Sequence, residues 1–141
     1  MMDEVTLGYH VFGTFRGELD GPNNVILIEH ALTGSSDVSD WWGDLLGPGR
    51  ALDTSRWCFI SVNALGGCHG STGPSSIASD GRAWGSRFPA VSIRDIVAAE
   101  AQLLAILGLE KIHAVIGGSM GGARALEWSL LYPEMMDAVC I

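Results

Sequence analysis

The sequence IHAVIGGSMGG occupies residues 112–122 and changes character halfway along. Ile112 to Ile116 form a short apolar run, which is typical of a strand buried on both faces of a parallel sheet. A Gly-x-Ser-x-Gly pattern centred on Ser119 follows directly, and a helical segment comes next. This strand–turn–helix order is the setting in which a sharp turn presents a nucleophilic serine. We therefore predict that Ser119 is the catalytic nucleophile.

A glycine-rich turn between a strand and a helix can also bind an anion, or serve only for close packing. The phosphate-binding versions have their own signatures, Gly-x-x-x-x-Gly-Lys-Ser/Thr and Gly-x-Gly-x-x-Gly. Neither signature occurs in residues 112–122. The nucleophile interpretation is therefore favoured over the phosphate-binding one.

A serine nucleophile also needs backbone N–H groups that hold the oxyanion of the reaction intermediate. The residue after the serine, here Met120, supplies one donor, and the loop after an earlier strand supplies the second. That loop is His30 to Gly34, directly after the apolar run 25–29, so Leu32 or Thr33 is expected to offer its N–H. An ordinary strand-end turn would have the same position in the sequence.

The general base is missing from the expected place. In this kind of site the acid and then the base follow the nucleophile along the chain. The three acidic residues after Ser119 lie within or close to the next helix, and no histidine follows it. His30 and His69 could approach through loops, whereas His113 belongs to the preceding strand, and chain order argues against all three. We therefore expect the acid and the base C-terminal to Ile141.

The remaining pattern predicts an α/β fold with a mostly parallel sheet flanked by helices. A helix is expected from the N-cap Ser92, with Asp95 three residues later, to a stop at Gly108. Its apolar face is expected to comprise Ile93, Ile96, Val97, Leu103, Leu104 and Leu107. Further expectations are a strand or hairpin within 5–15, a turn at 20–24, strands at 25–29, 57–62 and 112–116, a helix at about 121–131, and functional loops at 31–48 and 64–89.

Ala138 to Ile141 resemble the opening of another buried strand. A complete domain rarely ends on the first residues of a core strand. We therefore expect residues 1–141 to be the C-terminally truncated, N-terminal portion of one domain, with the rest of the domain and a lid outside it.

Composition excludes several classes of function. The formal charge is −8 with a single lysine, so a polyanion such as DNA or RNA would be repelled. No apolar run is long enough to span a bilayer, and the start lacks a signal-peptide pattern, so a cytoplasmic location is expected. Three cysteines without a Cys-x-x-Cys pair and four scattered histidines predict neither a disulfide framework nor a metal site.

Several stretches carry a more specific pattern than the serine turn. They are His30-Ala31-Leu32-Thr33-Gly34, Asp40-Trp41-Trp42, Gly47-Pro48-Gly49, Asn63-Ala64-Leu65-Gly66-Gly67-Cys68, Gly70-Ser71-Thr72-Gly73-Pro74-Ser75-Ser76, Arg87-Phe88-Pro89, Ser92-Ile93-Arg94-Asp95, 117–122, Ala125-Leu126-Glu127-Trp128 and Tyr132-Pro133. On these residues the chain resembles the homoserine O-acetyltransferase family of methionine biosynthesis, within the α/β-hydrolase superfamily. The match spans about residues 5–141.

The resemblance implies a reaction in two steps. Ser119 would take an acetyl group from acetyl-CoA, and the hydroxyl of L-homoserine would then accept it, with the N–H groups of Leu32 and Met120 holding the oxyanion. Acetyl-CoA would be a co-substrate, and no cofactor would be bound permanently. In the family the acid, the base, an arginine that grips the homoserine carboxylate and a helical lid lie further along the chain, and the enzyme is a homodimer.

Two other readings stay open. A serine esterase on the same scaffold would share the serine turn and differ only in whether water outcompetes an alcohol. An inactive fragment that needs its C-terminal half would instead use an exposed final strand to find its partner.

Overall fold

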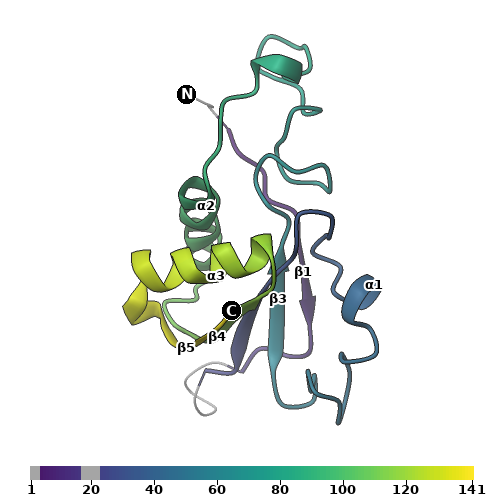
Figure 1. Cartoon of the computed structure of the whole chain (residues 1–141), viewed down its shortest axis with the longest axis vertical. Helices are drawn as coiled ribbons and strands as arrows, with labels where there is room; N and C mark the ends of the chain where they lie inside the picture. The colour runs from purple at the N-terminus through teal and green to yellow at the C-terminus, as the bar shows by residue number, and fades with distance from the viewer. Residues whose placement is uncertain (1–3, 17–22) are drawn as a thin grey trace.

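The computed structural model describes residues 4–16 and 23–141. These residues form a five-stranded sheet in the order β1-β3-β2-β4-β5, with α2 and α3 packed against each other beside it (Figure 1). The elements are β1 Tyr9–Phe12, β2 Val25–Glu29, α1 Ser39–Trp42, β3 Cys58–Val62, η2 Gly85–Arg87, α2 Ile93–Ile106, β4 Ile112–Gly117, α3 Met120–Leu131, η3 Pro133–Met135 and β5 Met136–Cys140.

The predicted mostly parallel sheet is confirmed. Strands β3, β2, β4 and β5 run parallel to one another in that order across the sheet. In the described residues only β1 is antiparallel, and it pairs with β3. The predicted strands at 25–29, 57–62 and 112–116 are β2, β3 and β4. Most of the final apolar run belongs to β5, which is largely exposed because it lies at the edge of the sheet, whereas the sequence predicts a buried strand. The early strand is β1, whereas the turn expected at 20–24 lies partly outside the described residues.

Alternation along β2 gives the sheet two buried faces, because successive side chains of a strand point to opposite sides. Val25 and Leu27 pack with α2 and α3 in the main core. Ile28 packs on the other face against Val38 and the tryptophans of α1. By the same alternation, Glu29 points toward α2 and α3, although it carries a carboxyl group.

Helix α2 begins as the sequence predicts. The Ser92 side chain accepts a hydrogen bond from the Asp95 N–H, and the Asp95 carboxylate accepts one from the Ser92 N–H, which completes a capping box. Gly108, at a φ of +77°, ends the helix in a conformation that glycine adopts without strain. The prediction that Leu107 belongs to the buried face is wrong: Leu107 is 37% exposed because the helix has ended at Ile106.

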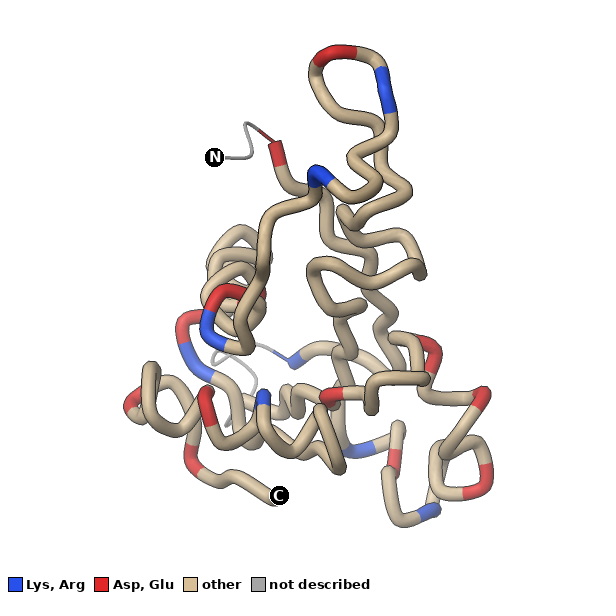
Figure 2. The backbone as a smooth tube through the Cα atoms, turned by 45° about the horizontal axis from the view of Figure 1, so that its top comes forward, with Lys and Arg blue, Asp and Glu red and all other residues tan. Residues whose placement is uncertain are grey.

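The loop 31–48 contains an element that the sequence did not predict. Helix α1 is a single turn that places Trp41 and Trp42 against the sheet, with their ring centroids 4.7 Å apart. No helix in the described residues is long and apolar enough to cross a membrane. The Lys and Arg positions are scattered along the described backbone (Figure 2).

Candidate active site

Ser119 occupies a strained turn between β4 and α3. Its φ of 59° and ψ of −125° make it the one non-glycine residue with positive φ among the described residues. Such a conformation costs roughly 1–3 kcal/mol and persists only where the surrounding structure holds it. Ser119 is exposed at the carboxyl edge of the sheet, where ligands of α/β proteins bind. The geometry is that of a nucleophile elbow, as the sequence predicts, and the role of nucleophile stays a prediction.

Glycines next to Ser119 allow the backbones to approach closely. A Cβ atom at Gly121 would collide with the carbonyl group of Glu29, and one at Gly117 would collide with the backbone of Gly121. A Cβ atom at Gly118 would meet nothing within 4 Å. Gly117 and Gly121, the two glycines of the Gly-x-Ser-x-Gly pattern, are thus required by packing, which explains their spacing.

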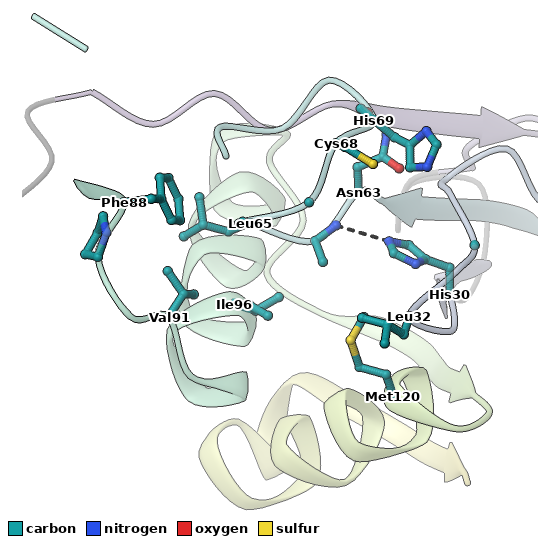
Figure 3. A pocket seen from close by; sticks show the side chains of 15 residues that line it. His30, Leu32, Asn63, Leu65, Cys68, His69, Phe88, Val91, Ile96 and Met120 are labelled. Atoms are coloured by element: carbon teal, nitrogen blue, oxygen red, sulfur yellow. Dashed lines mark hydrogen bonds between the residues drawn. The ribbon is translucent and has the colours of Figure 1, made fainter. Parts of the chain in front are cut away.

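The two predicted oxyanion donors lie on neighbouring elements. Glu29, the last residue of β2, pairs with Gly117, the last residue of β4, so the loop after β2 lies beside the elbow. Within the described part of the chain, neither the Leu32 N–H nor the Met120 N–H is engaged in a hydrogen bond. Both residues line one cavity, and Leu32 is 75% exposed (Figure 3). Their assignment as the oxyanion hole stays a prediction.

This cavity has a volume of about 290 Å³. The loops at 30–34, 63–69 and 88–91 line it, together with Ile96 of α2 and Met120 of α3. Leu65, Phe88 and Val91 make one wall apolar, as Figure 3 shows. The loop 64–89, which we predict to be functional, therefore contributes residues from both of its ends.

His30 lines the cavity, and its two hydrogen bonds define the tautomer of its ring. The backbone N–H of Ala64 can only donate, so the His30 Nε2 at 3.1 Å accepts its hydrogen bond. The His30 Nδ1 therefore carries the proton and donates to the carbonyl oxygen of Ala31 at 2.7 Å. Burial lowers the pKa of His30 and favours this neutral form. With both nitrogens engaged, His30 braces the donor loop and is unsuited to be the base.

The other three histidines occupy different surroundings. His69 lines the cavity on the side opposite Met120 (Figure 3). The His113 ring stacks on Trp57 with centroids 4.5 Å apart. The His10 Nδ1 lies 2.8 Å from the Ser36 hydroxyl. The described residues contain no cluster of three or more His, Cys, Asp or Glu side chains suited to a metal ion.

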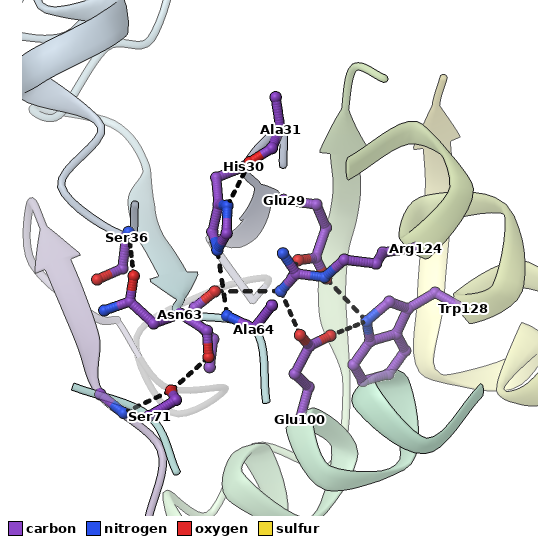
Figure 4. Close-up of polar contacts among 12 residues, drawn as sticks. Glu29, His30, Ala31, Ser36, Asn63, Ala64, Ser71, Glu100, Arg124 and Trp128 are labelled. Carbon is purple, nitrogen blue, oxygen red and sulfur yellow. Dashed lines mark hydrogen bonds and ion pairs between the residues drawn. The ribbon is translucent and has the colours of Figure 1, made fainter. Parts of the chain in front are cut away.

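A buried polar cluster that the sequence did not predict lies beneath the elbow (Figure 4). Arg124 of α3 forms ion pairs through its Nη2 with Glu29 of β2 and Glu100 of α2. The same nitrogen donates to the Val62 carbonyl oxygen at 3.1 Å. The Trp128 indole N–H lies 3.0 Å from Glu29 Oε1 and 3.1 Å from Glu100 Oε2. Glu100 lies within the apolar stripe of α2, and this interruption is the signal that could have revealed the cluster.

The cluster holds two carboxyl groups and one guanidinium, all at most 1% exposed. Burial raises the pKa of Glu29 well above its ordinary value, the Arg124 charge opposes this shift, and the charge of Glu100 adds to it. A proton on Glu29 makes the cluster electrically neutral, with Arg124 balanced by Glu100. This neutral arrangement avoids leaving an unbalanced charge in the core.

Comparison with known proteins identifies the fold family. The alpha/beta hydrolase fold family matches residues 24–141. The chain belongs to this family. A homoserine O-acetyltransferase of Corynebacterium efficiens is 55% identical over all 141 residues. The chain spans about 37% of the length of that relative.

Solved structures agree with this assignment and include two activities. A homoserine O-acetyltransferase from Bacillus anthracis superimposes with a TM-score of 0.87 at 32% identity, over 96% of this chain and 40% of that one. Esterase E22 superimposes with a TM-score of 0.81 at 39% identity, over 94% of this chain and 40% of that one. The scaffold around the elbow is therefore similar to both a transferase and an esterase.

Proposed function

We propose that the protein carrying residues 1–141 transfers an acetyl group from acetyl-CoA to the hydroxyl of L-homoserine, in methionine biosynthesis. The observation that carries this proposal is the strained turn at Ser119, which lies beside the loop after β2, together with the free N–H groups of Leu32 and Met120. The 55% identity to the Corynebacterium efficiens homoserine O-acetyltransferase supports the choice of donor and acceptor.

In the first step the Ser119 hydroxyl oxygen attacks the thioester carbonyl of acetyl-CoA. A general base takes the hydroxyl proton, the new C–O bond forms, and the C–S bond breaks. The base then passes that proton to the sulfur, so CoA leaves as the thiol. The N–H groups of Leu32 and Met120 stabilise the negative oxygen of the intermediate, and the N-terminus of α3 adds its positive dipole end.

In the second step the hydroxyl oxygen of L-homoserine attacks the acetyl group on Ser119. Its proton passes to the base and then to the departing Ser119 oxygen, which restores the enzyme and releases O-acetylhomoserine. Water must be kept from the acetyl-enzyme during this step. The apolar wall of the cavity, formed by Leu65, Phe88 and Val91, supports this shielding role.

The base is expected outside residues 1–141. His30 has both ring nitrogens engaged, and His113 is stacked on Trp57 away from the elbow. The relatives are longer than this chain, which leaves room for the acid and the base in their remaining length. We extend the proposal to a cytoplasmic location and to a homodimer. Light scattering of the natural polypeptide, meaning the whole protein that carries residues 1–141, tests the homodimer.

An ester hydrolase is the second candidate, because esterase E22 shares the scaffold at 39% identity. The two activities differ in the fate of the acetyl-enzyme. The natural polypeptide should form O-acetylhomoserine from acetyl-CoA and L-homoserine, measured by mass spectrometry, and release little free acetate. Release of acetate at the same rate with and without homoserine would assign the hydrolase instead.

A further inference from the structure

We propose that the buried cluster of Glu29, Glu100 and Arg124 is a positioning device that sets the separation of the two oxyanion donors. This inference rests on the proposed acyl-enzyme chemistry at Ser119. It assigns no contact with substrate to the three residues, which act through the backbones of Leu32 and Met120.

The cluster joins the two elements that carry the donors. Glu29 lies three residues before Leu32, at the end of β2. Arg124 lies four residues after Met120, one turn along the same face of α3. The contact between the Arg124 Nη2 and the Glu29 carboxyl group therefore connects the two donors through one short loop and one helical turn. A shift of α3 along β2 would change their separation directly.

The cluster also fixes the other neighbours of the elbow. Arg124 reaches Glu100 on α2 and the carbonyl oxygen of Val62 at the carboxyl end of β3. Trp128 donates to both carboxyl groups from the next turn of α3. Four elements beneath the elbow thus meet at one guanidinium group (Figure 4).

Stability alone does not explain these residues. The Arg124 Nε and Nη1 atoms are buried and have no hydrogen-bond partner among the described residues. Buried donors without partners cost free energy, and replacing a buried ion cluster with apolar side chains is often neutral or stabilising. A role in orientation accounts for the cluster, because an error of about 1 Å in catalytic geometry can cost a hundredfold in rate.

The test measures acylation of Ser119 per folded molecule in the natural polypeptide. The p-nitrophenyl acetate burst gives the acylation rate constant, and titration with a fluorophosphonate gives the number of reactive serines. Glu29→Ala should slow acylation on the order of tenfold or more, whereas Glu29→Gln, which keeps an acceptor for Trp128 and a donor for Glu100, should stay close to wild type.

A triple variant, Glu29→Met with Glu100→Met and Arg124→Met, separates positioning from stability. Its free energy of unfolding should equal or exceed that of wild type, and its acylation should still be roughly tenfold slower. The matched control is Glu127→Gln, which removes the surface ion pair between Arg94 of α2 and Glu127 of α3 and should leave acylation unchanged.

Wild-type acylation in the folded triple variant, or in Glu29→Ala, would overturn the positioning role. A slow Glu127→Gln variant would also overturn it, since any link between α2 and α3 would then have the same effect. The nitrophenyl ester needs no homoserine. Absence of homoserine acetylation in the wild type would therefore reject the proposed function. The acylation rates of the variants would still decide whether the cluster positions the oxyanion donors.

Discussion

Gly121 lies directly against the backbone of Glu29, so that a Cβ atom at Gly121 would collide with the Glu29 carbonyl group. This contact brings the first turn of α3 onto the end of β2. It holds the turn at Ser119 beside the loop that follows β2.

Substitution at this contact should separate the two elements. Gly121→Ala forces α3 away from β2 and should lower the free energy of unfolding by about 1–3 kcal/mol, as overpacking does. Gly118→Ala is the matched control, because its Cβ atom would meet nothing within 4 Å, and it should change stability by less than about 0.5 kcal/mol. Urea unfolding checks both values. Equal destabilisation by the two substitutions would show that the contact is unimportant.

The strain at Ser119 predicts which of two substitutions gives the larger free energy of unfolding. Ser119→Gly and Ser119→Ala both remove the hydroxyl, yet only glycine adopts a φ of 59° without steric cost. We expect Ser119→Gly to be more stable than Ser119→Ala by about 1 kcal/mol, measured by urea unfolding. An alanine variant as stable as the glycine variant would mean that the turn is not strained.

His30 should remain neutral as the pH falls. Its folded-state pKa lies below the ordinary 6.5, so its contribution to stability is full above pH 6.5 and is lost as the pH falls toward the folded pKa. Nitrogen chemical shifts should show a protonated Nδ1 and an unprotonated Nε2 near neutral pH. A His30 that titrates at or above 6.5, or carries its proton on Nε2, would contradict the bracing role and restore it as a candidate base.

Glu29 should make stability fall with rising pH. Its raised pKa means that the folded state keeps the proton more tightly than the unfolded chain. Its contribution is therefore full below about 4.5 and is lost as the pH rises through the folded pKa. Glu29→Gln should gain stability relative to wild type between pH 5 and pH 9 in parallel urea unfolding series, on the order of 1 kcal/mol. If the difference in the free energy of unfolding between Glu29→Gln and wild type stays constant with pH, Glu29 is ionised in the core and the prediction is wrong.

The sequence predicts the sheet because its signals are local. Apolar runs, the capping box at Ser92 and the stop at Gly108 depend on near neighbours, and each appears in the structure. Ser119 is found for the same reason, since the Gly-x-Ser-x-Gly pattern and the strand and helix that flank it are adjacent in the sequence. The single helical turn at Trp41 depends instead on packing against Ile28 across the sheet, and no periodicity over four residues reveals it.

Glu100 within the apolar stripe of α2 is a local signal of a buried polar contact, but its partners in the buried cluster could not be predicted from local signals. Glu29, Glu100 and Arg124 lie on three elements far apart in the sequence, and their pairing depends on which face of β2 the last side chain takes. Alternation from Leu27 places Glu29 on the helix-covered face. Only the folded structure shows that Arg124 contacts Glu29 on this face.

The acetyl-enzyme itself tests the central claim most directly. The natural polypeptide is mixed with acetyl-CoA, quenched within one turnover, digested and mapped by mass spectrometry, with and without a brief chase of L-homoserine. The account predicts an acetyl group on the peptide that contains Ser119, which disappears on the chase as O-acetylhomoserine appears. An acetyl group on another residue, or one on Ser119 that homoserine does not remove faster than water does, would contradict it.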